Sequence, residues 1–186
     1  MRVAFVENND SFSWNVLDAL PVERAQVTVV RGGRPEATRA LEGAEALIIG
    51  PGPMDPERAG LLELVRAAAE RRLPTLAICL GHQALGLCFG ARVVRSRPAH
   101  GKRASATFTA SRRFPGVVGA VEVMRYHSLS LEQVREPLEV IASLDDGTVM
   151  AVEHRTLPMA GLQFHPDSHG TPRGRELLDA FFRSLR

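Results

Sequence analysis

The sequence predicts an α/β fold with a mixed, mainly parallel open sheet flanked by helices and a smaller antiparallel extension. Up to about Arg92, short apolar runs rich in β-branched residues alternate with helical patterns. Such alternation is typical of right-handed βαβ units, whose helices bury both faces of a parallel sheet. After Arg92 the apolar runs follow one another without helices between them, which favours antiparallel pairing.

The predicted elements follow in a regular order along the chain. In the first part, strands are predicted at residues 2–6, 26–30, 46–50 and 75–79, and helices at residues 12–20, 35–41, 56–72 and 81–89. The second part predicts strands at residues 91–94, 105–109, 120–124, 138–143, 148–154 and 159–164, and an amphipathic helix at residues 174–185. No repeat or long linker interrupts the chain, so residues 1–186 are predicted to form a single domain.

The bulk composition argues against several classes of protein. The chain has a formal net charge of +2 and 45% apolar residues, which is ordinary for a globular domain. The charges nearly balance, and no basic stripe, RNA-binding aromatic motif or zinc-ligand spacing is apparent, so nucleic acid is not an expected partner. Without a long apolar run or a secretion signal, the chain is also predicted to be cytoplasmic, with no membrane partner.

Cys79 has the local sequence of a catalytic nucleophile. It ends an apolar strand and directly precedes a predicted helix, with Ala77 and Gly81 on either side. A strained strand-to-helix turn needs small neighbours, and it offers the backbone N–H of the next residue, Leu80, to an oxyanion. The helix N-terminus also favours a thiolate. Taken alone, Cys79 could equally be a small buried hydrophobic residue; Cys88, inside an apolar helical pattern, is interpreted as core.

His165 and Asp167 are the predicted base and its orienting partner. Proline forces the residue before it into an extended conformation, so residues 165 and 167 can project to the same side. A thiol nucleophile needs a base, and the base needs a group that fixes its tautomer. A histidine before proline is by itself more often structural, so the hypothesis depends on Cys79. His82 and His127 remain open between packing and chemical roles, and neither shows metal-ligand spacing.

The segment GPGPMDP follows the predicted strand at residues 46–50. Its prolines restrict the loop, and its glycines let the backbone approach a ligand closely, as a second oxyanion N–H would require. By itself, GPGP is a common turn. It is not a phosphate-binding loop, because no GK[ST] follows.

Together these segments resemble the class I glutamine amidotransferases, and within them the small subunits of anthranilate synthase and aminodeoxychorismate synthase. The resemblance spans nearly the whole chain and rests on the ordered motifs ENNDSF, GPGP, CLGHQ, HGK, RYHSL and GLQFHPDS. The NNDSF, HGK and RYHSL segments look like the chorismate branch of the family. The implied fold is flavodoxin-like.

The resemblance implies an activity and a partner. Glutamine would be hydrolysed to glutamate and ammonia through a thioester on Cys79, with His165 carrying the protons. The ammonia would pass to a chorismate-binding synthase large subunit, with anthranilate synthase as the first expectation and aminodeoxychorismate synthase as the second. No cofactor or metal is expected in this chain, whereas Mg²⁺ is expected in the partner.

The resemblance also implies a set of residues that bind L-glutamine. Carried over by position, they are Gly52, Pro53, Met54, Leu80, Gln83, Ser128 and Leu129. Gly52 and Leu80 would supply oxyanion N–H groups. Gln83 would contact the bound glutamine, and the backbone of Ser128 and Leu129 would hold its α-amino and carboxyl groups.

Departures from the family pattern keep two alternatives open. Asp167 stands where the family has Glu and is ~1.5 Å shorter, and a catalytic group misplaced by ~1 Å can cost about 10²-fold in rate. Met54 and Ala77 stand where the family usually has glycine. These changes favour a non-catalytic partner-binding module of the same fold as a second hypothesis. A γ-glutamyl hydrolase is the third, and Gln83 with the RYHSL segment argues against it.

Overall fold

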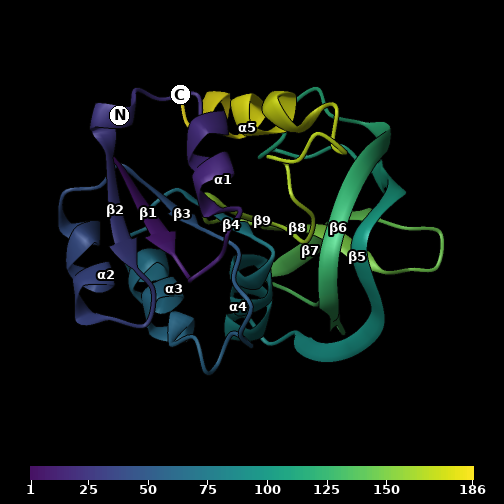
Figure 1. The fold of residues 1–186 in the computed structure, drawn as a ribbon, viewed down its shortest axis with the longest axis horizontal. Coiled ribbons are helices and arrows are strands. Elements are labelled where there is room, and N and C mark those ends of the chain that lie inside the picture. Colours follow the sequence, from purple (N-terminus) through teal and green to yellow (C-terminus); the bar gives the residue numbers. More distant parts are fainter.

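The computed structural model describes residues 1–186 as one nine-stranded sheet with helices on both faces (Figure 1). The strands are β1 (Val3–Glu7), β2 (Val27–Arg31), β3 (Ala46–Ile49), β4 (Thr75–Ile78), β5 (Arg92–Phe108), β6 (Gly119–Glu132), β7 (Leu138–Ser143), β8 (Val149–His154) and β9 (Met159–Leu162). The α-helices are α1 (Ser13–Ala19), α2 (Pro35–Arg39), α3 (Leu61–Glu70), α4 (Leu80–Cys88) and α5 (Gly174–Arg183). Across the sheet, the strand order is β2-β1-β3-β4-β9-β8-β7-β5-β6.

The two halves of the sheet differ in strand direction. Strands β2, β1, β3, β4 and β9 pair in parallel, whereas β8, β7, β5 and β6 continue the sheet with antiparallel pairs. Helices intervene between the first strands, whereas β5 to β9 are joined directly by loops, as antiparallel pairing allows. The predicted mixed sheet with its antiparallel extension is therefore confirmed.

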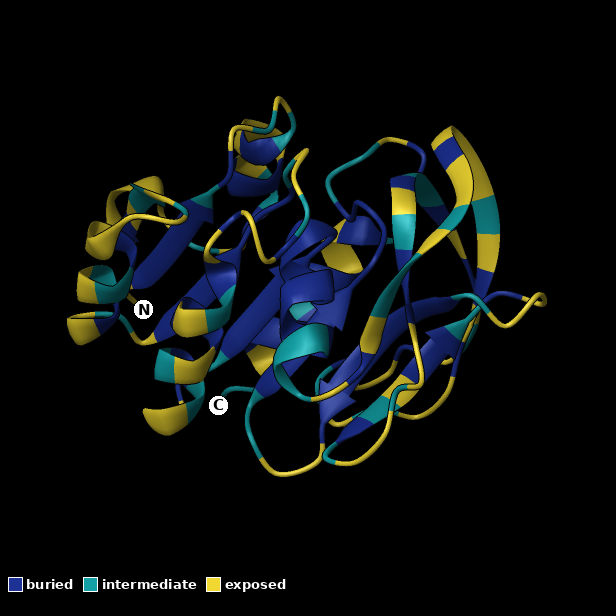
Figure 2. Ribbon diagram, turned by 90° about the horizontal axis from the view of Figure 1, so that it is seen from below, coloured by how far each residue is buried: buried dark blue, intermediate teal, exposed yellow.

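The sheet is buried on both faces over most of its width. Helices α1 and α5 cover one face, and α2, α3 and α4 cover the other (Figure 1). The buried apolar side chains accordingly form two clusters, of 30 and 22 residues. Neighbouring residues of β3 alternate between them, with Ile48 in the first cluster and Ile49 in the second. The central strands are consequently dark blue in Figure 2, which marks them as buried.

One long hairpin replaces the short strands predicted at residues 91–94, 105–109 and 120–124, so those boundaries are wrong. Strand β5 has 17 residues and β6 has 14. Their register shifts between Arg95 and Ala99 and again between His100 and Lys102. Pro98 and Gly101 lie within these bulges, where a missing N–H and a φ of 65° are tolerated. Bulges therefore carry the strand through a segment whose composition is typical of a loop.

The predicted helix at residues 56–72 begins later than expected, at Leu61. Gly60 precedes it with φ 66°, a left-handed conformation that glycine adopts without strain. Residues 50–60 therefore remain a loop at the end of β3. None of the helices combines the length and apolar character needed to cross a bilayer.

Candidate active site

Cys79 occupies a strained turn between β4 and α4. Its φ of 52° and ψ of −100° lie outside the regions that non-glycine residues normally adopt. The turn is held from both sides, because the Cys79 N–H donates to the Leu162 carbonyl at 2.8 Å and its own carbonyl accepts from the Gln83 N–H at 3.1 Å. Cys79 thus stands at the N-terminus of α4, in the kind of elbow that the sequence predicted.

Two glycines bring the backbone close to this elbow. A Cβ atom at Gly81 would lie 2.5 Å from the Ile49 carbonyl oxygen, so α4 packs directly on the end of β3. A Cβ atom at Gly52 would lie 2.4 Å from the Leu80 side chain. Asn8 fixes the same loop by donating from Nδ2 to the Gly50 carbonyl at 2.9 Å. The backbone of Gly52 is therefore held against the first residue of α4.

His165 reaches Cys79 because their strands are neighbours. Strand β9 pairs in parallel with β4, so the residues that follow the two strands meet at the same edge of the sheet. The His165 N–H donates to the Met124 carbonyl at 3.1 Å, and its carbonyl accepts from Thr171 Oγ1 at 2.8 Å. These bonds fix the backbone of His165 between β6 and the segment leading to α5.

Asp167 faces the ring of His165. Its Oδ1 lies 3.5 Å from His165 Nδ1, and both side chains are almost wholly buried. Neither carboxylate oxygen has a hydrogen-bond partner elsewhere. A buried carboxylate without other partners is costly, so the His165 imidazolium is the charge that compensates it.

The surroundings of His165 favour its charged form. Burial alone would lower the pKa of His165, but its interactions with the nearby Asp167 carboxylate and Cys79 outweigh burial and raise the pKa to about 10. Because Nδ1 faces Asp167, Nε2 is the nitrogen left to face the thiol. Phe12 and Tyr126 pack edge-on against the imidazole, with ring centroids at 5.3 and 5.1 Å. The ring is thereby fixed in one plane.

Cys79 and His165 open into one pocket of about 330 Å³. This volume lies at the small end of the range for small-molecule sites, about 300–1,000 Å³. The pocket is also lined by residues that the family resemblance assigns to substrate: Gly52, Pro53, Met54, Gln83, Ser128 and Leu129. Leu80 and Asp167 do not line it. Leu80 is 1% exposed, so only its backbone could contribute to the site. Asp167 contacts the side of the His165 ring that carries Nδ1.

Residues without a predicted role complete the lining: Asp10, Phe12, His100, Tyr126 and His127. Asp10 accepts a hydrogen bond from the Phe12 N–H at 2.8 Å, which turns the chain so that Phe12 reaches His165. Their membership of the ENNDSF, HGK and RYHSL motifs was the available signal. The three motifs are far apart in the sequence, so the sequence alone did not show that these residues line one pocket.

Gln163 lies beside Cys79, and the sequence alone predicted no role for it. It is fully buried, and its Nε2 lies 3.8 Å from Cys79 Sγ. Its Oε1 accepts from Gln83 Nε2 at 3.3 Å, and the same Gln83 nitrogen lies 3.4 Å from the Leu129 carbonyl. A polar chain therefore links the thiol to the far wall of the pocket. The available signal was strand alternation, which puts residues 163 and 165 on one side.

The two histidines left open by the sequence are both neutral. Burial lowers the pKa of His127 to about 4. Its Nε2 accepts from Arg125 Nε at 3.1 Å, so its proton resides on Nδ1, 2.8 Å from the Leu129 carbonyl. Burial between α4 and β9 likewise lowers the pKa of His82 to about 3. His127 therefore positions Leu129, and His82 is a packing residue.

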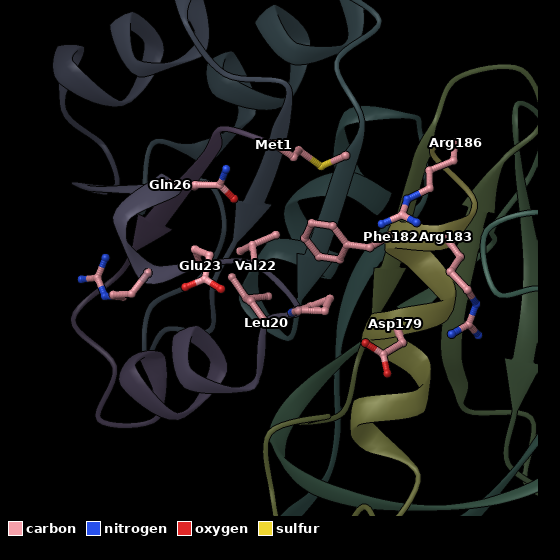
Figure 3. Close-up of a pocket in the computed structure, with 11 residues that line it drawn as sticks. Met1, Leu20, Val22, Glu23, Gln26, Asp179, Phe182, Arg183 and Arg186 are labelled. Atoms are coloured by element: carbon pink, nitrogen blue, oxygen red, sulfur yellow. The ribbon is translucent and has the colours of Figure 1, made fainter.

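A larger hollow lies at the opposite edge of the sheet (Figure 3). It measures about 500 Å³. It is lined by Met1 and by residues at the C-terminal ends of α1 and α5, including Leu20, Phe182, Arg183 and Arg186. It contains neither histidine nor cysteine. Ligands of open α/β sheets bind at the carboxyl ends of the strands, where Cys79 lies, and not at this edge. No group of three or more His, Cys, Asp or Glu side chains is placed to hold a metal ion.

Comparisons with known proteins agree with this geometry. The model of the glutamine amidotransferase class-I family matches residues 4–185. The chain is 40% identical over 189 residues to an aminodeoxychorismate synthase of Streptomyces griseus, matching all of this chain but only 26% of that protein. It is 37% identical over 186 residues to anthranilate synthase component 2 of Azospirillum brasilense, covering 97% of this chain and 95% of the relative.

The fold has a close counterpart among solved structures. A putative GMP synthase subunit from Thermoplasma acidophilum superposes with a TM-score of 0.87, at 21% sequence identity, over 100% of this chain and 94% of the other. At that identity, the likeness speaks for the fold alone. The family match, the full-length relatives and the Cys79–His165 pocket agree, and the chain belongs to the class-I glutamine amidotransferases.

Proposed function

We propose that this chain is the glutaminase subunit of a chorismate-using synthase, in which it hydrolyses glutamine and supplies ammonia to a separate large subunit. The observation that carries the proposal is the pairing of a strained Cys79 at a helix N-terminus with a protonated His165 in one small pocket. The names of the relatives, anthranilate synthase component 2 and aminodeoxychorismate synthase, support the acceptor chemistry.

The first half of the reaction forms a thioester. The Cys79 thiolate attacks the side-chain amide carbon of glutamine, and the carbonyl electrons move onto oxygen. The backbone N–H groups of Leu80 and Gly52 would stabilise this oxyanion, since Leu80 follows Cys79 directly and the Gly52 backbone packs closely against Leu80. When the intermediate collapses, the C–N bond breaks. His165 then gives its proton to the leaving nitrogen, so ammonia departs.

The second half releases glutamate. His165, now neutral, takes a proton from water, whose oxygen attacks the thioester carbon. The C–S bond breaks, glutamate leaves, and the imidazolium beside the Cys79 thiolate is restored. Asp167 serves both halves by orienting the ring and compensating its charge.

The remaining lining residues bind the substrate. Gln83 contacts the glutamine, and the backbone of Ser128 and Leu129 holds its α-amino and carboxyl groups. Pro53 and Met54 close the opposite side of the pocket. This chain uses no cofactor in the reaction, and Mg²⁺ serves the chorismate chemistry in the partner.

The relatives include anthranilate synthase and aminodeoxychorismate synthase components at similar sequence identity, so an experiment must assign the large subunit that accepts the ammonia. Anthranilate synthase is the first expectation and aminodeoxychorismate synthase the second. Each large subunit from the same organism is mixed with this chain, glutamine and chorismate, and the aromatic product is measured. The cognate large subunit should raise kcat of glutamine hydrolysis more than it lowers KM, as expected for an interaction completed in the transition state.

Covalent labelling tests the glutaminase itself. A diazo-ketone analogue of glutamine should modify Cys79 with one equivalent and abolish glutamate release, and excess glutamine should protect. Cys88→Ser is the matched control and should label like the wild type. The non-catalytic alternative is motivated by the 3.5 Å gap between Asp167 and His165, and it predicts that Cys79 stays unlabelled even with the partner bound.

A further inference from the structure

We propose that the β5–β6 hairpin beside the pocket mouth is the docking surface for an acidic face of the ammonia-accepting protein. This inference rests on the proposed function and identifies the surface that the partner uses. The cationic surface is defined by Arg95, Arg97, Lys102 and Arg103 of β5 and Arg125 of β6.

The four cations of β5 have no partners within the chain, whereas Arg125 of β6 is half-buried and donates to His127 Nε2. Arg95, Arg97, Lys102 and Arg103 are all exposed, and none forms an ion pair or a side-chain hydrogen bond. Elsewhere in the chain, Arg112 and Arg155 bind Glu139, and Arg173 binds Glu176. The near-neutral net charge averages over the whole chain and does not reveal this local excess of cations.

The strand register brings like charges together. Lys102 pairs with Arg125 across the hairpin, whereas Arg103 pairs with Met124 and projects to the other face, so the cations occupy both faces of this edge hairpin. Like charges directly opposite one another destabilise a sheet. Asp146 attracts Arg125 but forms no ion pair with it. An external acidic surface would relieve this repulsion. The segment from residue 95 to residue 103 itself contains no Asp or Glu.

The cationic surface borders the glutamine pocket. The same hairpin also lines that pocket, through His100, Tyr126, Ser128 and Leu129. In the register, Arg95 pairs with Leu129, and Lys102 pairs with Arg125. The same pocket is lined by Met54, which is 41% exposed although it is apolar. Methionine is enriched in protein interfaces, whose rims are polar.

Ammonia delivery requires that the partner cover this mouth. Ammonia released at Cys79 would otherwise be protonated and lost to solvent, and both Met54 and the hairpin line the pocket that holds Cys79. A partner placed there would meet the cationic surface. Because complementary charges act mainly on encounter, they should govern the association rate more than the final affinity per contact.

Charge reversal in the reconstituted complex tests the proposal. The variants R95E/R97E and K102E/R103E each change the charge by the same amount, and R39E/R71E on α2 and after α3 is the matched control. Arg39 and Arg71 are likewise exposed and unpaired. Binding is measured by surface plasmon resonance at several salt concentrations, with whichever large subunit stimulates the wild type. Glutamine-dependent and ammonia-dependent synthesis are followed in parallel.

Each hairpin variant should lower the association rate at least tenfold and flatten its salt dependence. Glutamine-dependent synthesis at limiting partner should fall accordingly, while isolated glutaminase activity stays within twofold. The control should associate within twofold of the wild type. Wild-type binding by both hairpin variants overturns the docking surface and leaves the proposed function standing. If neither large subunit binds the wild type, the proposed partner and this surface both fail.

A nucleic acid is the competing occupant of a cationic strand. Fluorescence anisotropy with a labelled 20-mer RNA and a 20-mer DNA duplex at 150 mM salt should detect no binding by the wild type. Micromolar binding that R95E/R97E abolishes would overturn the acidic-protein assignment.

Discussion

The parallel and antiparallel halves of the sheet contribute different things to the same pocket. From the parallel half come the groups to which we assign the chemistry: Cys79 after β4, His165 after β9 and the Gly52 loop after β3. The antiparallel half contributes Ser128 and Leu129, together with the exposed cations of β5.

The difference follows from what each kind of strand can offer. A parallel strand ends in a turn toward a helix, so its carboxyl end can present a strained residue at a helix N-terminus. A hairpin strand runs past the site and presents backbone groups and side chains along its length. Changes in the parallel half should therefore alter kcat, whereas changes in the hairpin should alter binding of glutamine or of the partner.

Replacing Cys79 should have the largest effect. Cys79→Ala removes the nucleophile, so glutamine-dependent synthesis in the complex should fall by more than about 10⁴-fold. Synthesis with added ammonium chloride should remain within twofold, because the acceptor chemistry lies in the other subunit. Loss of both activities would indicate a structural Cys79, and loss of neither would refute the nucleophile.

Asp167 should come next, through kcat alone. Asp167→Asn keeps the shape but cannot compensate the His165 imidazolium, so kcat should fall about 10²-fold with KM little changed. Asp167→Glu could close the 3.5 Å gap to Nδ1 and should retain or raise activity if reach is the deficit. An Asp167→Asn rate within twofold of wild type, with partner saturating, removes Asp167 from the catalytic residues.

Gln163 sharpens the comparison within the parallel half. Gln163→Leu deletes the N–H that lies 3.8 Å from Cys79 Sγ and leaves Gln83 Nε2 with only the Leu129 carbonyl as acceptor. We expect about a tenfold loss in kcat, the equivalent of about 1.4 kcal/mol, which is typical of one hydrogen bond to a charged group. Alkylation of Cys79 by iodoacetamide at a fixed pH should also slow. A purely packing role would leave that alkylation rate in place.

His127 tests the hairpin half. His127→Phe keeps the ring but loses the bond to the Leu129 carbonyl, so KM for glutamine should rise about fivefold while kcat stays within twofold. Because burial holds the pKa of His127 at about 4, its loss should not change the activity profile between pH 6 and 9. A fall in kcat larger than the rise in KM would break the division between the two halves.

The smallest effect concerns stability against pH. The folded-state pKa of His165 is raised to about 10, above the value of about 6.5 expected when unfolded. The resulting stability is fully present below about pH 6.5 and is lost as pH rises through about 10. Tm should therefore fall by a few degrees between pH 7 and 10, and by less in Cys79→Ala, where one cause of the shift is gone. Calorimetry of both proteins that shows equal slopes would contradict this account.

The elements of the parallel half could be predicted from the sequence because their signals are local. A β-branched run followed by a helical pattern recurs there. The small residues within two positions of Cys79 predict the strained turn. In the hairpin the same reasoning failed, since Pro98 and Gly101 lie in bulges that depend on the partner strand. The start of α3 at Leu61 was missed for a similar reason, because GPGPMDP is held by Asn8 and Leu80 from elsewhere.

The sequence by itself determined the residue types of the site and their order: a cysteine after one strand, a histidine and an aspartate after another, and a glycine-rich loop. Only the tertiary structure decided which of them meet and in which state. Adjacency of β4 and β9 brings Cys79 to His165, and burial beside Asp167 and the thiol holds that imidazole charged while it leaves His127 neutral. Both outcomes depend on distances between segments far apart in the chain, which strand pairing sets and local sequence does not encode.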